Sequence, residues 1–160
     1  SSTLGKGYIE AAVRATVTDI MQNALKAVGS SDEIGVFLGL DGAAGLSPST
    51  FCFAQDEAGE DGIVDTFVCY TQINQEIRKC TIMASNGGPR NCVATDEFLG
   101  TAVANSINLP VDADVNPTLD CTIFRITLTS RNDPTQPRSA TNREYIYQNS
   151  VSIPGINCAE

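Results

Sequence analysis

The first part of the chain carries an apolar stripe with the period of an α-helix. Between residues 8 and 28 the apolar positions recur mostly at steps of three and four, which places them along one helix face. They are Ile9, Val13, Val17, Ile20, Ala24, Leu25 and Val28. Gly29 follows the last of them, and a glycine there supplies the left-handed residue that ends many helices. The pattern predicts an amphipathic helix over about 8–28 that packs against a sheet.

After Gly29 the helical period gives way to alternation. Ile34–Leu40 is a short apolar run in a Gly- and Ser-rich stretch, compatible with a strand or with a loop packed on the core. From Thr50 onward, β-branched and aromatic residues alternate with polar ones between turn clusters, which is typical of strands. The predicted strands are Thr50–Ala54, Ile63–Ile73, Glu76–Ala84, Ala102–Leu109, Cys121–Ser130 and Arg143–Ile153.

One helix followed by a run of strands predicts an α+β fold, in which the N-terminal amphipathic helix packs on an antiparallel β-sheet. Asn74-Gln75 is interpreted as a two-residue hairpin turn, which sets Ile73 opposite Glu76 and, counting outward, Cys69 opposite Cys80. No linker or repeat divides the chain. We therefore expect a single domain over 1–160, with the β-region from about 50 to 158.

Six cysteines in 160 residues indicate disulfide bonds and an oxidising compartment. Metal binding through thiolates is the competing interpretation, but the chain has no CxxC pair and no histidine. The predicted disulfide cysteines are Cys52, Cys69, Cys80, Cys92, Cys121 and Cys158. The hairpin register favours a Cys69–Cys80 bridge, because opposed residues approach disulfide range. Cys80–Cys92, across the Gly87-Gly88-Pro89 loop, is the alternative.

Charge and missing residue types exclude several functions. A net charge of −9 argues against nucleic-acid binding and against adsorption to anionic lipid through a basic face. The absence of histidine removes Ser–His and Cys–His catalysis. No Walker A, G-x-S-x-G or dinucleotide fingerprint is present. The sequence therefore predicts a protein that is not an enzyme, with no catalytic residue and no organic cofactor.

One acidic segment resembles the opening of a calcium-binding loop. Oxygen ligands occur there at alternate positions, as in an EF-hand. The candidate ligands are Asp112, Asp114, Asn116 and Asp120. Pro117 replaces the required glycine, however, and Ile123 stands where a bidentate glutamate is expected. Since Asp and Asn are also ordinary turn formers, turn formation is the main interpretation and calcium the alternative.

The order of the predicted pieces resembles a known family. The pieces are the helix Val13–Gly29, the hairpin Asp65–Tyr70 with Glu76–Arg78, the strand Thr101–Pro110, the closing pair Phe124–Thr129 and Asn142–Tyr147, and Ser150–Pro154. In this order, most of the chain resembles the globular part of type IV pilins and minor pilins. It also resembles the minor pseudopilins of type II secretion, those of the J class among them.

The resemblance implies a non-catalytic subunit of a type IV pilus, or fimbrium, or of a type II secretion pseudopilus. Its partners would be other pilin or pseudopilin subunits. In the family an apolar N-terminal helix anchors the subunit in the inner membrane before filament assembly. Because the chain opens at Ser1 without such a run, we expect that helix to be missing from its start. The implied location is extracytoplasmic, in the periplasm or in a cell-surface filament.

The chain also departs from the family. The glutamate and methylated N-terminus of the apolar helix have no counterpart here, and six cysteines exceed the general pattern. The alternative function is a secreted disulfide-rich binding module or adhesin that recognises a surface or a glycan. Tryptophan is absent and aromatic residues make up 6% of the chain, which weakens the case for glycan stacking.

The cysteine pattern makes a first prediction about stability. Reduction should lower the melting temperature, because a bridge that closes a 15-residue loop contributes about 3 kcal/mol in the chain-entropy model. Thermal unfolding followed by circular dichroism, with and without a reductant, measures the difference. An unchanged melting temperature would mean that the cysteines are free thiols, and the argument for an oxidising compartment would fail.

Overall fold

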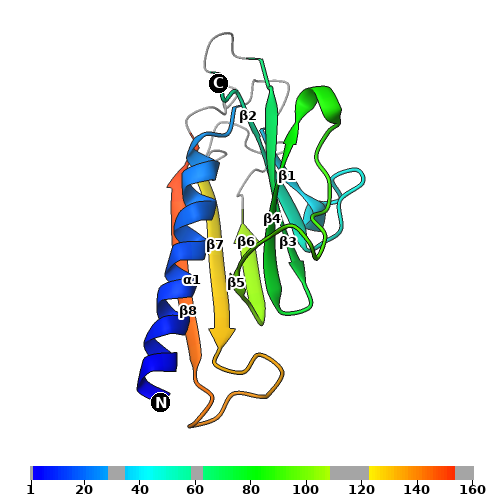
Figure 1. Ribbon diagram of the computed structural model, residues 1–160. Helices are drawn as coiled ribbons and strands as arrows, with labels where there is room; N and C mark the ends of the chain where they lie inside the picture. The colour runs from blue at the N-terminus through cyan, green and yellow to red at the C-terminus, as the bar shows by residue number, and fades with distance from the viewer. Residues whose placement is uncertain (1, 29–34, 59–62, 109–122, 154–160) are drawn as a thin grey trace.

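The computed structural model describes residues 2–28, 35–58, 63–108 and 123–153 (Figure 1). Within these residues one long helix is followed by strands and two short 3-10 turns. The elements are α1 (Ser2–Leu25), β1 (Val36–Leu38), η1 (Gly39–Asp41), β2 (Thr50–Gln55), β3 (Thr66–Ile73), β4 (Glu76–Met83), η2 (Ala84–Asn86), β5 (Glu97–Thr101), β6 (Ala104–Asn108), β7 (Ile123–Arg131) and β8 (Glu144–Ser152).

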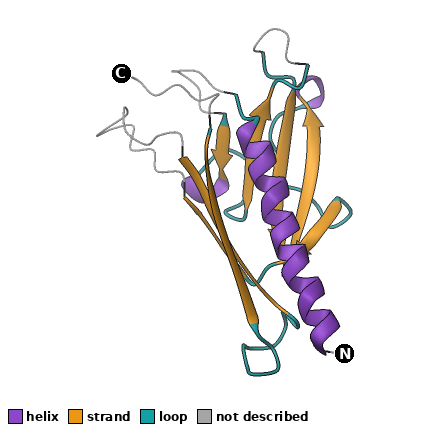
Figure 2. Ribbon diagram, turned by 90° about the vertical axis from the view of Figure 1, so that its left-hand side faces the viewer, coloured by secondary structure: helices purple, strands orange, loops and turns teal. Residues whose placement is uncertain are grey.

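The strands form two antiparallel sheets instead of the single sheet expected. The larger sheet has the order β1-β2-β3-β4-β5, and the smaller has the order β6-β7-β8. Every neighbouring pair is antiparallel, so the predicted α+β class with antiparallel pairing is confirmed. Helix α1 packs against β7 and β8 of the smaller sheet and against β5 of the larger one. Figure 2 shows it running along the seam between the two sheets.

The apolar stripe of the predicted helix forms part of the core. Val13, Val17, Ile20 and Ala24 are buried, and Ile9 packs against the same cluster from a half-buried position. The prediction that Leu25 packs in the core is wrong, because Leu25 lies on the solvent side of the helix and is 48% exposed. Met21 is buried as well, and so is Thr16, which a stripe of apolar residues does not mark.

The helix ends at Leu25, three residues before the predicted end. The chain then becomes extended: Ala27 forms an isolated antiparallel bridge with Gln55, and the N–H of Val28 donates to the carbonyl of Ala54 at 2.8 Å. Pairing with the end of β2 thus replaces the last helical turn. Gly29, the predicted capping residue, lies outside the described residues.

Aromatic side chains join the two sheets. Phe51 and Phe53 of β2 and Tyr70 of β3 are buried together with Phe124 of β7. The ring of Phe124 lies 5.2 Å from that of Phe53 and 6.0 Å from that of Phe51, and Phe51 stacks on Tyr70 at 5.2 Å. These separations are in the range of favourable aromatic pairs. The core is therefore continuous across both sheets.

The chain passes from one sheet to the other next to Ala102. The N–H of Ala102 donates to Gln75 of the larger sheet, at the turn between β3 and β4, whereas the N–H of Val103 donates to Thr129 of β7. Just before this point, the hydroxyls of Thr101 and Ser130 are hydrogen-bonded at 2.8 Å. The predicted strand Ala102–Leu109 is therefore shorter, because its first residues form the crossing, and β5 before it was not predicted.

The β3–β4 hairpin has the predicted register. Ile73 lies opposite Glu76, and Cys69 lies opposite Cys80. Asn74 takes the left-handed conformation, with φ of 52°, and is the one non-glycine residue with positive φ in the described part of the chain. A type I′ turn requires positive φ at both central residues, whereas this turn has positive φ at Asn74 and not at Gln75.

The loop between β7 and β8 is organised by one buried side chain. The amide nitrogen of Asn142 donates to the carbonyls of Asp133, Gln136 and Pro137, and its oxygen accepts from the N–H of Asp133. The Asp133 carboxylate in turn accepts from the N–H and the hydroxyl of Thr135, which hold the pKa of that carboxyl below its usual range. The loop lies at the same end of the molecule as the start of α1 (Figure 1).

The burial of α1 predicts a sharp difference between neighbouring positions. Val17→Asp should unfold the domain, because an unpaired charge at a fully buried site costs several kcal/mol, comparable to total stability. Thr18→Asp is the matched control, since Thr18 is exposed on the same helix and should tolerate the change. Circular dichroism of both variants tests this.

Hydrogen exchange provides a second measurement of the same helix. We expect the slowest amide exchange over 13–24, where the buried residues lie, and faster exchange before Ile9. The reverse order would show that the apolar stripe does not stabilise the helix.

Candidate functional site

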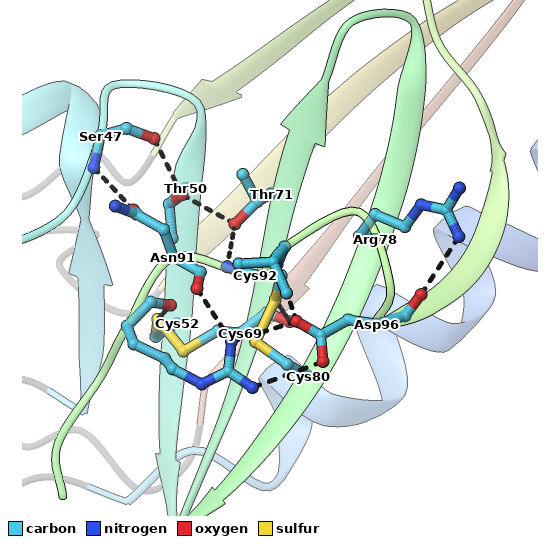
Figure 3. The surroundings of a disulfide bond; sticks show 12 residues. Ser47, Thr50, Cys52, Cys69, Thr71, Arg78, Cys80, Asn91, Cys92 and Asp96 are labelled. Atoms are coloured by element: carbon cyan, nitrogen blue, oxygen red, sulfur yellow. Dashed lines mark hydrogen bonds and ion pairs between the residues drawn. A yellow bond between two sulfur atoms is a disulfide. The ribbon is translucent and has the colours of Figure 1, made fainter.

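Four of the predicted disulfide cysteines form one buried cluster on the face of the larger sheet that lies away from the aromatic core. Cys52 of β2 is bonded to Cys69 of β3, and Cys80 of β4 is bonded to Cys92 in the segment before β5. Figure 3 shows the two bonds side by side. The alternative Cys80–Cys92 pairing is confirmed, and the Cys69–Cys80 bridge is wrong. Cys121 and Cys158 lie outside the described residues.

Hydrogen-bond parity explains why Cys69 pairs with Cys52. Cys69 lies opposite both Cys52 and Cys80, on either side of β3. The Cα atoms of Cys52 and Cys69 are 4.0 Å apart, which marks a non-hydrogen-bonded pair, the closer of the two kinds in an antiparallel sheet. The backbone N–H and C=O of Cys69 then point toward β4, so Cys69 and Cys80 form the wider, hydrogen-bonded pair. The right register was therefore not sufficient to choose the bond.

A chain segment before β5 is held against this cluster. The N–H of Cys92 donates to the buried hydroxyl of Thr71 at 2.8 Å, and Thr71 also shares a hydrogen bond with Thr50. The side-chain oxygen of Asn91 accepts from the N–H of Ser47 at 2.8 Å. The segment covers part of the second face of β2 and β3, together with Phe37, Leu46 and Phe67, and every residue of β2 is buried.

An ion pair closes the turn after this segment. The carboxylate of Asp96 accepts from the guanidinium of Arg90 at 3.1 Å and from the N–H of Val93 at 2.7 Å. These hydrogen bonds hold the pKa of the Asp96 carboxyl below its usual range. Arg78 donates to the backbone carbonyl of Asp96 and lies over the ring of Phe98. The side chains lock the loop in place.

The geometry does not favour a metal centre at the cluster. Sulfur atoms of Cys80 and Cys92 and a carboxylate oxygen of Asp96 lie within 4.8 Å of one another. Both sulfurs are bonded to each other, however, and a metal requires free thiolates. The calcium candidates Asp112, Asp114, Asn116 and Asp120 lie outside the described residues.

The residues directly after β2, Asp56–Ala58, form part of a turn that is closed by Asp65. The carboxylate of Asp65 accepts from the N–H groups of Glu57 and Ala58 and from the hydroxyl of Thr66. These bonds, that of Glu57 foremost, lower the pKa of the Asp65 carboxyl. Because the oxygens of the Asp65 carboxylate face hydrogen-bond donors, this side chain stabilises the turn and is not arranged as a ligand of a cation.

A polar network connects α1 to the larger sheet, and the sequence analysis missed it. The hydroxyl of Tyr70 donates to the carboxylate of Asp19 at 2.7 Å and accepts from the amide of Asn23 at 2.8 Å. Lys79, which lies opposite Tyr70 on β4, forms an ion pair with Asp19 at 3.1 Å. Gln55 donates to both the side chain and the backbone carbonyl of Asn23. The spacing of Asp19 and Asn23, one helical turn apart, was the available signal.

Burial defines the protonation state of Tyr70. The residue is fully buried, and burial together with the neighbouring Asp19 carboxylate raises the pKa of Tyr70 far above its ordinary value. The phenol therefore stays protonated and acts as a hydrogen-bond donor. It holds α1 in one rotational position, because Asp19 and Asn23 must both face the sheet.

Comparisons with known proteins identify no relative. No family model matches the chain, and neither a curated protein nor a solved structure matches it. The geometry described above is therefore the basis for a functional proposal. Among the described residues, the polar clusters around Tyr70 and Cys92 connect elements of the fold to one another.

The Tyr70 network predicts a pH-dependent difference between two variants. At neutral pH Tyr70→Phe should lose about 1–3 kcal/mol of stability, because it removes hydrogen bonds to a charged group and to Asn23. The folded-state pKa is raised, so the contribution of the phenol is complete below its unfolded pKa of about 10 and decreases above it. The difference between wild type and variant should therefore shrink as pH rises above about 10. Urea unfolding at pH 7 and pH 10.5 measures it; a constant difference would contradict the assignment.

Proposed function

We propose that this chain is a non-catalytic structural subunit of an extracytoplasmic filament of the type IV pilin-like kind, a type IV pilus or a type II secretion pseudopilus. In this proposal it takes no cofactor. Its partners are other pilin or pseudopilin subunits, and an apolar helix joined to its start anchors it in the inner membrane. The two disulfides support the oxidising, extracytoplasmic environment that such a location requires.

The observation that carries the proposal is the position of α1. The helix lies along one side of the molecule, with its start at one end of the body (Figure 1). A helical extension from that end would leave the domain along the α1 axis and would cross neither sheet. Such an arrangement suits a subunit whose globular domain surrounds a core of packed helices.

The outer face of α1 offers a contact surface. Three of the six residues that border a shallow hollow of about 410 Å³ there have small side chains, and two are charged. The residues around the hollow are Ala11, Arg14, Ala15, Thr18, Gln22 and Asp19, whose carboxylate also binds Tyr70 and Lys79 of the larger sheet. Small side chains let a second helix approach closely, which supports packing against a neighbouring subunit.

Expression of the full gene product in the cells that make it tests the proposal. The protein should be found in the membrane fraction and in filaments sheared from the surface. Ala15→Arg should reduce its amount in filaments at least about tenfold, since a bulky charge would be placed in a close helix contact. The isolated A15R domain should melt like the parent, because Ala15 is exposed.

Ser85→Arg is the matched control, because Ser85 is exposed in η2, which follows β4 and lies away from α1 (Figure 1). It should leave filament incorporation unchanged. A protein released into the medium as a soluble monomer after cleavage of a conventional signal peptide would contradict the proposal and favour a secreted binding module.

A further inference from the structure

The segment 90–92 lies directly over the Cys52–Cys69 bond. The carbonyl oxygen of Arg90 lies 3.9 Å from the sulfur of Cys52, and the sulfur of Cys92 lies 3.3 Å from the carbonyl oxygen of Cys69 (Figure 3). Disulfide sulfurs have no hydrogen to donate, so these are packing contacts. Cys52 and Cys69 have no exposed surface, and this segment provides part of their cover.

The cover is tied covalently by the other disulfide. Residues 85–88, between β4 and the cover, are exposed. Within the cover, Asn91 is exposed; its side chain accepts from the N–H of Ser47 at 2.8 Å and donates to the carbonyl of Gly45 at 3.5 Å. Cys80 and Cys92 retain slight exposure, 5% and 3%, where the inner pair has none. Cys80–Cys92 therefore joins the more exposed pair of cysteines, and it is the covalent link that holds the cover, in addition to hydrogen bonds such as that of the Cys92 N–H to Thr71.

We propose that the two disulfides form a nested redox lock with an obligatory order. Under oxidising conditions Cys52–Cys69 forms first, and Cys80–Cys92 then closes over it. Under reducing conditions Cys80–Cys92 breaks first, the segment 84–92 comes away from the sheet, and Cys52–Cys69 becomes accessible. The intermediate that holds only the inner bond keeps β2 and β3 joined, so the sheet survives while the cover opens.

The chemistry of each reductive step is ordinary thiol–disulfide exchange. A thiolate of a dithiol reductant attacks one sulfur of the protein disulfide, and the other protein sulfur leaves as a thiolate. The second thiol of the reductant then displaces the attached cysteine. Two electrons and two protons pass to the two cysteines, and the reductant becomes a cyclic disulfide. Attack requires access to a sulfur along the bond, and the cover denies this access at Cys52 and Cys69.

A reduction time course under native conditions tests the order. The folded protein is treated with dithiothreitol, samples are quenched with one alkylating agent, and the remaining disulfides are reduced and labelled with a second. Trypsin separates the pairs, because residues 27–78 hold Cys52 and Cys69, residues 80–90 hold Cys80, and residues 91–125 hold Cys92 and Cys121. We expect thiols of Cys80 and Cys92 first, with a transient species in which Cys52–Cys69 remains intact.

Two double variants test whether the cover controls the rate at which the Cys52–Cys69 bond is reduced. In C80S/C92S the Cys52–Cys69 bond should be reduced at least about tenfold faster than in the parent, since its cover is released. In C52S/C69S the Cys80–Cys92 bond should keep its rate within about twofold. Circular dichroism establishes that each variant is folded; if C80S/C92S does not fold, the order in the parent decides.

Three results would overturn the lock: Cys52–Cys69 breaking first, both bonds breaking together, or rates independent of dithiothreitol concentration. The last would mean that reduction follows global unfolding. The inference rests on the geometry of four cysteines, so it fails or holds independently of the proposed filament role.

Discussion

The fold depends on α1 burying one face against two sheets at once. Neither sheet alone covers the aromatic core, because Phe124 of the smaller sheet and Phe53 of the larger one meet beneath the helix. Val17 and Ile20 close this core from above. The helix must therefore approach both sheets closely, and Gly100 of β5 makes room for it: a Cβ atom there would lie 2.9 Å from the hydroxyl oxygen of Thr16.

The sequence predicted the elements better than their assembly. The period of the apolar residues located α1, and the turn residues located the β3–β4 hairpin, because both signals are local in the sequence. The division into two sheets depends on one event at Ala102 and Val103, where successive N–H groups turn to different sheets. No pattern of residue types marks that event. The end of α1 was misplaced for a similar reason, since a distant partner, Gln55, competes for Ala27.

Prediction of the site had the same limit. Composition and spacing identified the cysteines, and the hairpin set the register, yet the partner of Cys69 followed from hydrogen-bond parity, which depends on the neighbouring strand β2. The Tyr70 network was not predicted because Asp19 falls outside the apolar stripe of α1, where solvent-exposed residues are expected. Its partners Tyr70 and Lys79 come from strands far along the chain.

The alignment of α1 with β7 and β8 has a mechanical consequence (Figure 2). Tension applied at the start of the helix along its axis would load the interface in shear, so the buried contacts from Val13 to Ala24 would resist together instead of peeling one by one. Beyond the helix, extension would next meet the Cys52–Cys69 and Cys80–Cys92 bonds, each of which prevents the chain between its two cysteines from extending. Under tension the domain should therefore stay short until α1 has separated from the sheets.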